Sequence, residues 1–423
     1  MAPGDAGAER FQGLPMKTSD AGSTWIATGT DSSRDPPDFS LVLGGPLYQL
    51  LRRTRLSDDA LKLQRRRIVV ISLFAWLPLL LLAAASGTLL GGDTKVPFLM
   101  DVEVHVRFLV VLPLLVAAEL VVHQRMRTVA RTFRDRELIP ESATPRLEAA
   151  VASAYRLRNS VSAEVVLIAI VYLLGVTIVW RHYTALETST WYATQAADGS
   201  HLTLAGFWYG YVSLPIFQFL LVRWYFRLFI WARLLWQVSR IELNLVPTHP
   251  DRVGGLGFLS NTAYAFVPLL MAHGAMLAGQ IANQIFYMGR KLTDFHLEIL
   301  LLVIWAVFLV VGPLLVFSGQ LAQTKRAGLR DYGNLAQRYV RGFDAKWVRG
   351  QAPADESFLG SGDIQSLADL GNSFEVVKGM RIVPVTKEAM LQLGAATLVP
   401  MVPLVLTLMP LDELLRKLLG IVF

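Results

Sequence analysis

Long apolar segments alternate with short polar ones along most of the chain. Six of them are long enough to cross about 30 Å of hydrocarbon as helices. They cover roughly residues 68–90, 105–123, 161–180, 204–222, 258–287 and 297–318. A seventh apolar segment, 389–410, is interrupted by Pro400, Pro403 and Pro410, so it either crosses the membrane or turns back. The pattern predicts an all-α, polytopic transmembrane helical bundle with six or seven spans.

The same pattern divides the chain into five parts. Gly, Ala, Ser, Asp and Pro dominate the N-terminus, which predicts disorder. Apolar and basic residues then mix, as in a segment that lies on a membrane surface. The parts are a disordered tail (1–38), an amphipathic basic juxtamembrane segment (39–67), a six-helix transmembrane domain (68–318), a cytoplasmic helical segment (319–388) with a flexible linker (350–362), and a C-terminal apolar helix with an amphipathic tail (389–423).

Several helices are expected to extend beyond the bilayer into a cytoplasmic layer. Apolar residues repeat at helical spacing in 147–154, 329–343 and 364–377, with Asp363 as a candidate cap of the last helix. No strong breaker follows the fourth span, so that helix continues inward through 223–240. The aromatic residues expected at its membrane interface are Trp224, Tyr225, Trp231 and Trp236.

Composition supports the membrane interpretation. The chain is 53% hydrophobic and 17% charged, whereas soluble domains carry about 25% charged residues. There is no cysteine, which excludes disulfides, thiolate metal sites and cysteine nucleophiles. No pattern of a catalytic triad, a metal site or a cofactor loop stands out, so we expect no cofactor, no metal and no catalytic residue.

The positive charges follow a topology pattern. Lys and Arg number seven in 52–67, eight in 123–163, five in 223–257 and ten in 324–389, against five in the segments between these. The positive-inside rule therefore predicts a cytoplasmic N-terminus. Because the net charge of +7 is distributed as a topology signal, we expect no nucleic-acid partner.

A polar, glycine-rich loop precedes the fifth span, with the sequence VPTHPDRVGGLGF at 246–258. Its His-Pro-Asp tripeptide also marks the J domains of co-chaperones, but there it lies between two soluble helices, so we exclude that relationship. Two interpretations stay open. The backbone N–H groups could hold an anion, a lipid headgroup or a carboxylate, or Asp251 could cap the helix in a tight re-entry turn. The candidate residues are His249, Asp251, Arg252, Gly254, Gly255 and Gly257.

The fifth span itself carries a polar stripe. His273, Gln280 and Gln284 lie within about 20° of one line along the helix. The stripe favours either a solute pathway or hydrogen bonds between helices. Glu119, late in the second span, is a further candidate for a proton or cation site, whereas Glu164 is expected to reach the membrane surface. Beside the stripe is a small-residue face of Ala272, Ala275, Gly279 and Ala282.

Two segments, HPDRVGGLGFL and DIQSLADLGNSFEVVKGMR, resemble parts of bacterial multi-pass membrane proteins. The resemblance implies a bacterial inner membrane as the location and implies no activity. The bilayer is therefore the first expected partner.

The leading functional hypothesis is a channel or transporter for a small solute or ion, with span 258–287 lining the path and the 249–257 loop at its cytoplasmic mouth. The alternative is a membrane-anchored interaction or signalling protein. Its helices 324–347 and 363–380 would bind a cytoplasmic partner or a second copy. A third hypothesis, an enzyme acting on lipid phosphates through Arg252, lacks an acidic metal cluster.

Overall fold

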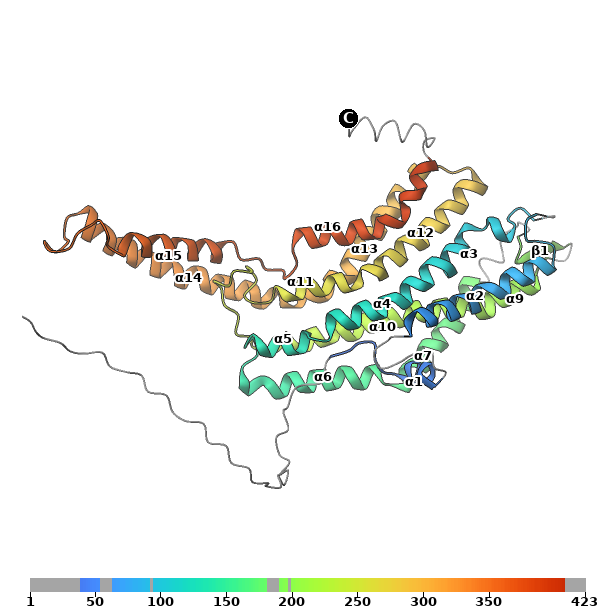
Figure 1. The fold of residues 1–423 in the computed structure, drawn as a ribbon, viewed down its shortest axis with the longest axis horizontal. Coiled ribbons are helices and arrows are strands. Elements are labelled where there is room, and N and C mark those ends of the chain that lie inside the picture. The colour runs from blue at the N-terminus through green and yellow to red at the C-terminus, as the bar shows by residue number, and fades with distance from the viewer. Residues whose placement is uncertain (1–38, 54–62, 92–93, 181–189, 197–198, 408–423) are drawn as a thin grey trace, which may run out of the picture. The chain divides into compact units, whose positions relative to one another are not determined.

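The computed structural model describes residues 39–53, 63–91, 94–180, 190–196 and 199–407 (Figure 1). Within these ranges the protein is almost entirely helical, which confirms the predicted all-α class. The predicted tails, 1–38 and 408–423, lie outside the described residues. The α-helices are α1 (Pro46–Arg53), α2 (Gln64–Ala85), α3 (Val102–Val106), α4 (Leu112–Met126), α5 (Val129–Asp135), α6 (Thr144–Arg158), α7 (Val161–Ile170), α9 (Leu204–Trp208), α10 (Leu214–Val238), α11 (Phe258–Ala263), α12 (Val267–Met288), α13 (His296–Val311), α14 (Ser318–Phe343), α15 (Asp363–Lys378) and α16 (Lys387–Leu398).

Short non-α turns join or extend many of these helices. Three-residue-per-turn segments are η1 (Phe98–Met100), η3 (Glu141–Ala143), η6 (Tyr264–Phe266), η7 (Leu292–Phe295), η8 (Gly312–Phe317) and η10 (Val399–Thr407). Wider π-helical turns are η2 (Arg107–Val111), η4 (Val171–Trp180), η5 (Tyr209–Ser213) and η9 (Asp344–Val348).

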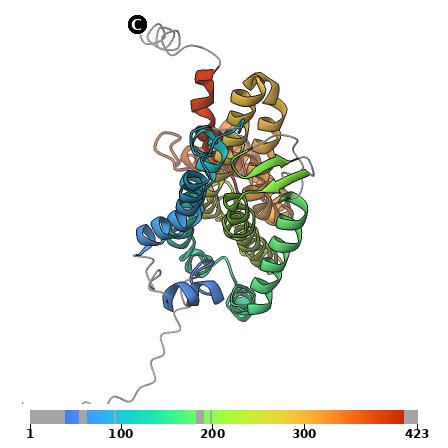
Figure 2. The same ribbon diagram turned by 90° about the vertical axis from the view of Figure 1, so that its right-hand side faces the viewer.

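One small hairpin departs from the all-α prediction. Strands β1 (Ala193–Ala196) and β2 (Gly199–Leu202) pair antiparallel, with Ala193 opposite Leu202 and Ala196 opposite Gly199. Figure 2 shows this hairpin at the end of the molecule that faces the viewer. It lies beside α9, just before the fourth apolar span begins.

Among the described residues, six continuous helical stretches are long and apolar enough to cross a membrane. They are Gln64–Ala85, Val102–Asp135, Leu204–Val238, Phe258–Met288, Leu292–Val348 and Lys387–Thr407. Five of them overlap predicted spans, and the sixth overlaps the C-terminal segment whose crossing the sequence left open. The predicted span 161–180 differs: it meets the criterion only together with Glu141–Arg158, bent by 50°. The bend arises where Ser160 caps α7 by accepting a hydrogen bond from the Ala163 N–H.

Prolines explain where several spans depart from α-helical geometry. Pro113, Pro215 and Pro268 each stand at the second residue of an α-helix, directly after the non-α turns η2, η5 and η6. Pro313 lies within η8 itself. Proline has no N–H and its ring crowds the carbonyl four residues earlier, so the helix widens or tightens there.

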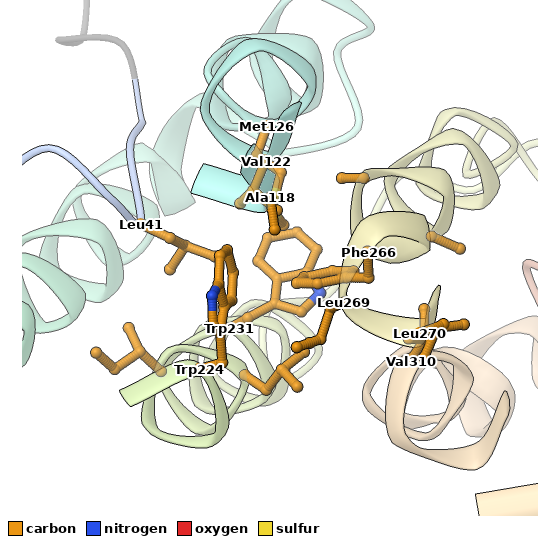
Figure 3. Packing of buried hydrophobic residues seen from close by; sticks show 14 of the residues in the cluster. Leu41, Ala118, Val122, Met126, Trp224, Trp231, Phe266, Leu269, Leu270 and Val310 are labelled. Atoms are coloured by element: carbon orange, nitrogen blue, oxygen red, sulfur yellow. The ribbon is translucent and has the colours of Figure 1, made fainter. Parts of the chain in front are cut away.

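The core lies between α4, α10, α12 and α13 (Figure 3). Trp224 and Trp231 of α10 are each 1% exposed, and the indole N–H of Trp224 donates to the Leu115 carbonyl at 2.9 Å. Both were expected at a membrane interface, and that expectation is wrong, because they fill the space between helices. Trp236, by contrast, is 49% exposed.

Helix α12 is the central helix of the bundle. In the most apolar 18 residues of the stretch Phe258–Met288, which contains α12, 67% of the residues are buried. The share is 22% in the stretches that contain α2 and α13. Helix α12 contacts α3, α4, α13 and α16. The predicted small-residue face is buried, and an added Cβ on Gly279 would lie 3.2 Å from the backbone of Glu103 in α3.

The predicted cytoplasmic helices pack on one another. Figure 1 shows α14 and α15 side by side, and the segment 350–362 between them contains no helix. Asp363, the candidate cap, is instead the first residue of α15, and Gly362 precedes it as the cap. Its carboxylate accepts hydrogen bonds from Lys346 at 2.9 Å and from the indole of Trp347 at 2.7 Å. The interaction function of this hairpin stays a prediction.

Candidate functional site

The polar stripe of α12 meets two different environments. His273 is 5% exposed, and its ring lies 5.0 Å from the ring of Trp305, centroid to centroid. Its Nδ1 lies 2.7 Å from the Leu269 carbonyl, which only accepts, so Nδ1 carries the proton. Its Nε2 therefore accepts from the hydroxyl of Tyr225 at 2.7 Å. His273 is thus a buried group with both ring nitrogens bonded, and its ring lies beside those of Tyr225 and Trp305.

Gln280 and Gln284, further along the stripe, line a pocket of about 300 Å³. This pocket lies between α12, the start of α3 and the segment 190–192. Seven of its lining residues carry polar groups besides the two glutamines: Asp101, Glu103, Thr190, Tyr192, Tyr209, Asn283 and Tyr287. The sequence placed His273, Gln280 and Gln284 in one polar stripe. In the structure only the two glutamines line the pocket, and His273 lies outside it.

A buried carboxylate anchors the pocket. Asp101 is 4% exposed and accepts hydrogen bonds from the Val104 N–H at 3.2 Å, the Asn283 amide at 2.8 Å and the indole of Trp191 at 2.9 Å. Asn283 in turn accepts from the Val102 N–H at 3.1 Å. These bonds tie α3 to α12. Every donor described for the Asp101 carboxylate is a neutral group.

An ion pair borders the same pocket. Arg107 of η2 forms a salt bridge with Glu103, one turn earlier, and donates to the Tyr209 hydroxyl. Its guanidinium also lies over the ring of Phe217, 5.6 Å from the centroid. Because Arg107 offsets Glu103, Asp101 is the lining carboxylate that has no cationic partner among the described contacts.

The glycine-rich loop before α11 is organised around Asp251. One of its oxygens accepts the N–H groups of Val253 at 2.8 Å and Gly255 at 3.2 Å, and the other accepts that of Gly257 at 2.8 Å. Partial burial alone would raise the pKa of Asp251, but these N–H groups together outweigh it, so the pKa lies below its ordinary value. The groups that an external anion would need are bonded to Asp251.

The other loop candidates have structural positions as well. Arg252, Gly254 and Gly255 adopt left-handed backbone conformations, with φ of 56°, 65° and 99°. The Arg252 carbonyl accepts the Arg381 N–H at 2.7 Å, which fastens the loop to the segment after α15. His249 Nδ1 lies 2.9 Å from an Asp251 carboxylate oxygen. Gly257 is the cap residue of α11 without a side-chain cap bond. Anion binding by this loop stays a prediction, and we base no proposal on it.

Glu119 belongs to a buried cluster at the end of the long helices opposite the pocket. We call it the arginine–glutamate cluster, and it consists of Arg67, Glu119, Glu164, Arg223 and Arg227. Glu119 is 4% exposed, forms a salt bridge with Arg67, and lies 2.8 Å from Arg227 and 3.6 Å from Arg223. Three guanidinium groups favour the charged carboxylate. This surrounding differs from that of a proton or cation site, which needs access to a free carboxylate.

Glu164 completes the cluster. It is 8% exposed, where the sequence predicted a side chain reaching the membrane surface, and that prediction is wrong. Its carboxylate lies 3.4 Å from Arg223 and accepts the Leu47 N–H at 2.8 Å. The N-terminal segment therefore packs on the cluster, and Phe39, Leu41 and Val42 are each 1% exposed.

Sequence reasoning missed the three arginines as buried residues. It counted Arg67, Arg223 and Arg227 as cytoplasmic surface charges, yet each is less than 7% exposed. One signal was present: Arg223 and Arg227 are four residues apart and so lie on one face of α10. Their partners Glu119 and Glu164 come from other spans, so spacing alone does not pair them.

Within the described ranges, no group of three or more His, Asp or Glu side chains has the arrangement of a metal site. Comparison of the chain with protein-family models, curated proteins and solved structures gives no match. The two sites above are therefore interpreted from their own chemistry.

Proposed function

We propose that the chain is a multi-pass membrane protein that moves a small polar solute, neutral or cationic, across a cell membrane. The observation that supports this is the polar pocket of about 300 Å³ at one end of the central helix α12. Polar groups inside a membrane span are costly, and those that face a cavity usually mark a substrate or ion path. In this proposal α12 lines the path, with Gln280 and Gln284 contacting the solute.

The surface of the spans supports the membrane part of the proposal. Large apolar side chains are exposed on the outer faces, among them Leu81 at 61%, Leu301 at 55% and Phe308 at 65%. Exposed apolar faces of this extent need a nonpolar environment. The distribution of Lys and Arg supports a cytoplasmic N-terminus, and the bacterial resemblance noted above supports an inner membrane. The pocket then opens on the extracytoplasmic side.

The charged groups of the pocket favour a neutral or cationic solute over an anion. Asp101 is bound by neutral donors, whereas Glu103 is paired with Arg107. One uncompensated carboxylate attracts cations and repels anions. The Gln280 amide adds donors and an acceptor for a neutral or cationic solute, and the Gln284 amide adds donors, since its oxygen already accepts a hydrogen bond from Arg290 at 3.0 Å.

The packing of α12 favours a carrier over an open channel. Next to His273, an added Cβ on Gly274 would lie 1.9 Å from the Thr397 carbonyl oxygen, so α12 and α16 are in close contact. This helix contact and the ring contact between His273 and Trp305 fill the interior of the bundle on one side of the pocket. A carrier would open this contact while it closes the pocket.

Flux into liposomes tests the proposal. The purified full chain is reconstituted, and uptake of three radiolabelled probes is measured: rubidium ion, methylammonium and glycerol. We expect at least one probe to enter faster than into protein-free liposomes. The double variant Gln280→Ala/Gln284→Ala should lower that rate about thirtyfold, since two lost hydrogen bonds of roughly 1 kcal/mol each raise the barrier by about 2 kcal/mol.

Gln337→Ala is the matched control, because Gln337 is exposed on α14, outside the pocket. It should leave the flux unchanged. Equal uptake of all three probes with and without protein, or full uptake by the double variant, would contradict the proposal.

A further inference from the structure

The structure also contains a two-part groove beside the arginine–glutamate cluster. The first part is an apolar pocket of about 380 Å³ between α2, α4 and α10. The second part, about 400 Å³, lies between α1, α7 and α10. Leu47 and Phe219 line both, so the two parts meet at these residues.

The apolar part runs along one face of α2. Arg67, Val70, Ile71 and Phe74 line it and follow one another at helical spacing over about 10 Å. Val70 and Phe74 are 40% and 53% exposed, so this part opens towards the outer face of the bundle. Its dimensions and lining suit a hydrocarbon chain.

The second part carries polar groups. Arg53 and Gln49 of α1 line it together with Glu164. The charge of Glu164 is already offset by Arg223 at 3.4 Å. Arg53 is exposed and contributes a positive charge at the end of the groove.

The cluster behind the groove is positive as a whole. Its three guanidinium groups face two carboxylates, which leaves one positive charge. Arg67 lines the apolar part, is 2% exposed, and its Nε has no hydrogen-bond partner among the described residues.

We propose that this groove binds one anionic glycerophospholipid of the bilayer, such as phosphatidylglycerol. An acyl chain occupies the apolar part along α2, and the phosphate lies beside Arg53, in the field of the cluster. Basic residues next to the cytoplasmic end of a span attract anionic lipids. The inference rests on the membrane location in the proposed function and does not depend on transport.

Thermal unfolding of the purified full chain in a neutral detergent tests the inference. Phosphatidylglycerol should raise the Tm more than phosphatidylcholine does, because only the former carries net negative charge. Arg53→Gln should shift the midpoint of the phosphatidylglycerol titration about fivefold upward. Arg330→Gln, which removes the same charge from an exposed position on α14, should leave the midpoint unchanged.

Two further arms identify the ligand. Val70→Trp, at a 40% exposed position, should fill the apolar part and remove the preference for phosphatidylglycerol. Glycerol 3-phosphate, which has the phosphate and no acyl chain, should not raise the Tm. Equal shifts with both lipids, a full preference in Arg53→Gln, or a full shift with glycerol 3-phosphate would each overturn the inference. Flux is a separate readout, so loss of transport with the lipid preference intact contradicts only the proposed function.

Discussion

Glu119→Gln tests whether the arginine–glutamate cluster is an electrostatic unit. The Glu119 side chain is 6% exposed and its carboxylate contacts Arg67, Arg223 and Arg227. The substitution keeps the shape of the side chain and removes its charge, so three guanidinium groups are left with Glu164 alone. Breaking a buried ion pair by removing one partner costs about 3–5 kcal/mol. We expect a loss of this size in the free energy of unfolding.

Glu164→Gln gives the internal comparison. Glu164 contacts one guanidinium at 3.4 Å and one backbone N–H at 2.8 Å, so its substitution should cost less, about 1.5–3 kcal/mol. Glu242→Gln is the control, because Glu242 is exposed in the segment after α10, and it should change stability by at most about 0.5 kcal/mol.

The assay is chemical unfolding of the purified variants in the same detergent micelles, followed by tryptophan fluorescence. Trp224 and Trp231 are buried next to the cluster and report on its packing. If Glu119→Gln lost no more stability than Glu242→Gln, the three contacts would not form a charged unit, and the argument from charge would fail.

Two further predictions concern the loop and the central helix. The backbone N–H groups that Asp251 accepts hold its pKa below the ordinary value. Its stabilising contribution is therefore complete above the unfolded pKa and is lost as pH falls through the lower folded pKa. The Tm of the native chain should therefore fall more steeply than that of Asp251→Asn between about pH 5 and pH 2; parallel curves would contradict this. Gly274→Ala should cost about 1–3 kcal/mol, because its Cβ would lie 1.9 Å from the Thr397 carbonyl oxygen. Gly371→Ala in α15, where an added Cβ meets nothing within 4 Å, should be neutral or stabilising, and an equal loss in both variants would refute the packing argument.

The positions of the spans could be predicted from the sequence because an apolar run of about 20 residues has few alternatives. The break at Asn159 and Ser160 was harder to foresee. It depends on a cap formed by Ser160, and serine is common in both helices and caps. The sequence therefore predicted a straight span at 161–180. In the structure this segment is preceded by α6, and the two meet at a bend of 50°.

The candidate site was predicted in part. Gln280 and Gln284 line the pocket, but His273 does not. Helical periodicity gives the direction of a side chain around the axis, yet His273 and Gln280 are seven residues, about 10 Å, apart along it. Over that distance the neighbouring helices change, and with them the environment.

The contacts that the sequence did not predict join residues that lie far apart along the chain. Asp101 meets Asn283 across 182 residues, and Glu119 meets Arg227 through the packing of α4 on α10. Positive-inside counting treats every arginine near a span end as solvated. It cannot separate Arg223 and Arg227, which face the core, from those that face solvent.

Cysteine labelling tests the central claim most directly, because the chain has no cysteine of its own. Gln284→Cys and His273→Cys are each exposed to a membrane-impermeant maleimide in right-side-out and inverted vesicles. The account predicts labelling of Gln284→Cys from the extracytoplasmic side only, and no labelling of His273→Cys from either side. A Gln284→Cys variant that stays unlabelled from both sides, or reacts only from the cytoplasmic side, would contradict a solute pocket open to the extracytoplasmic face.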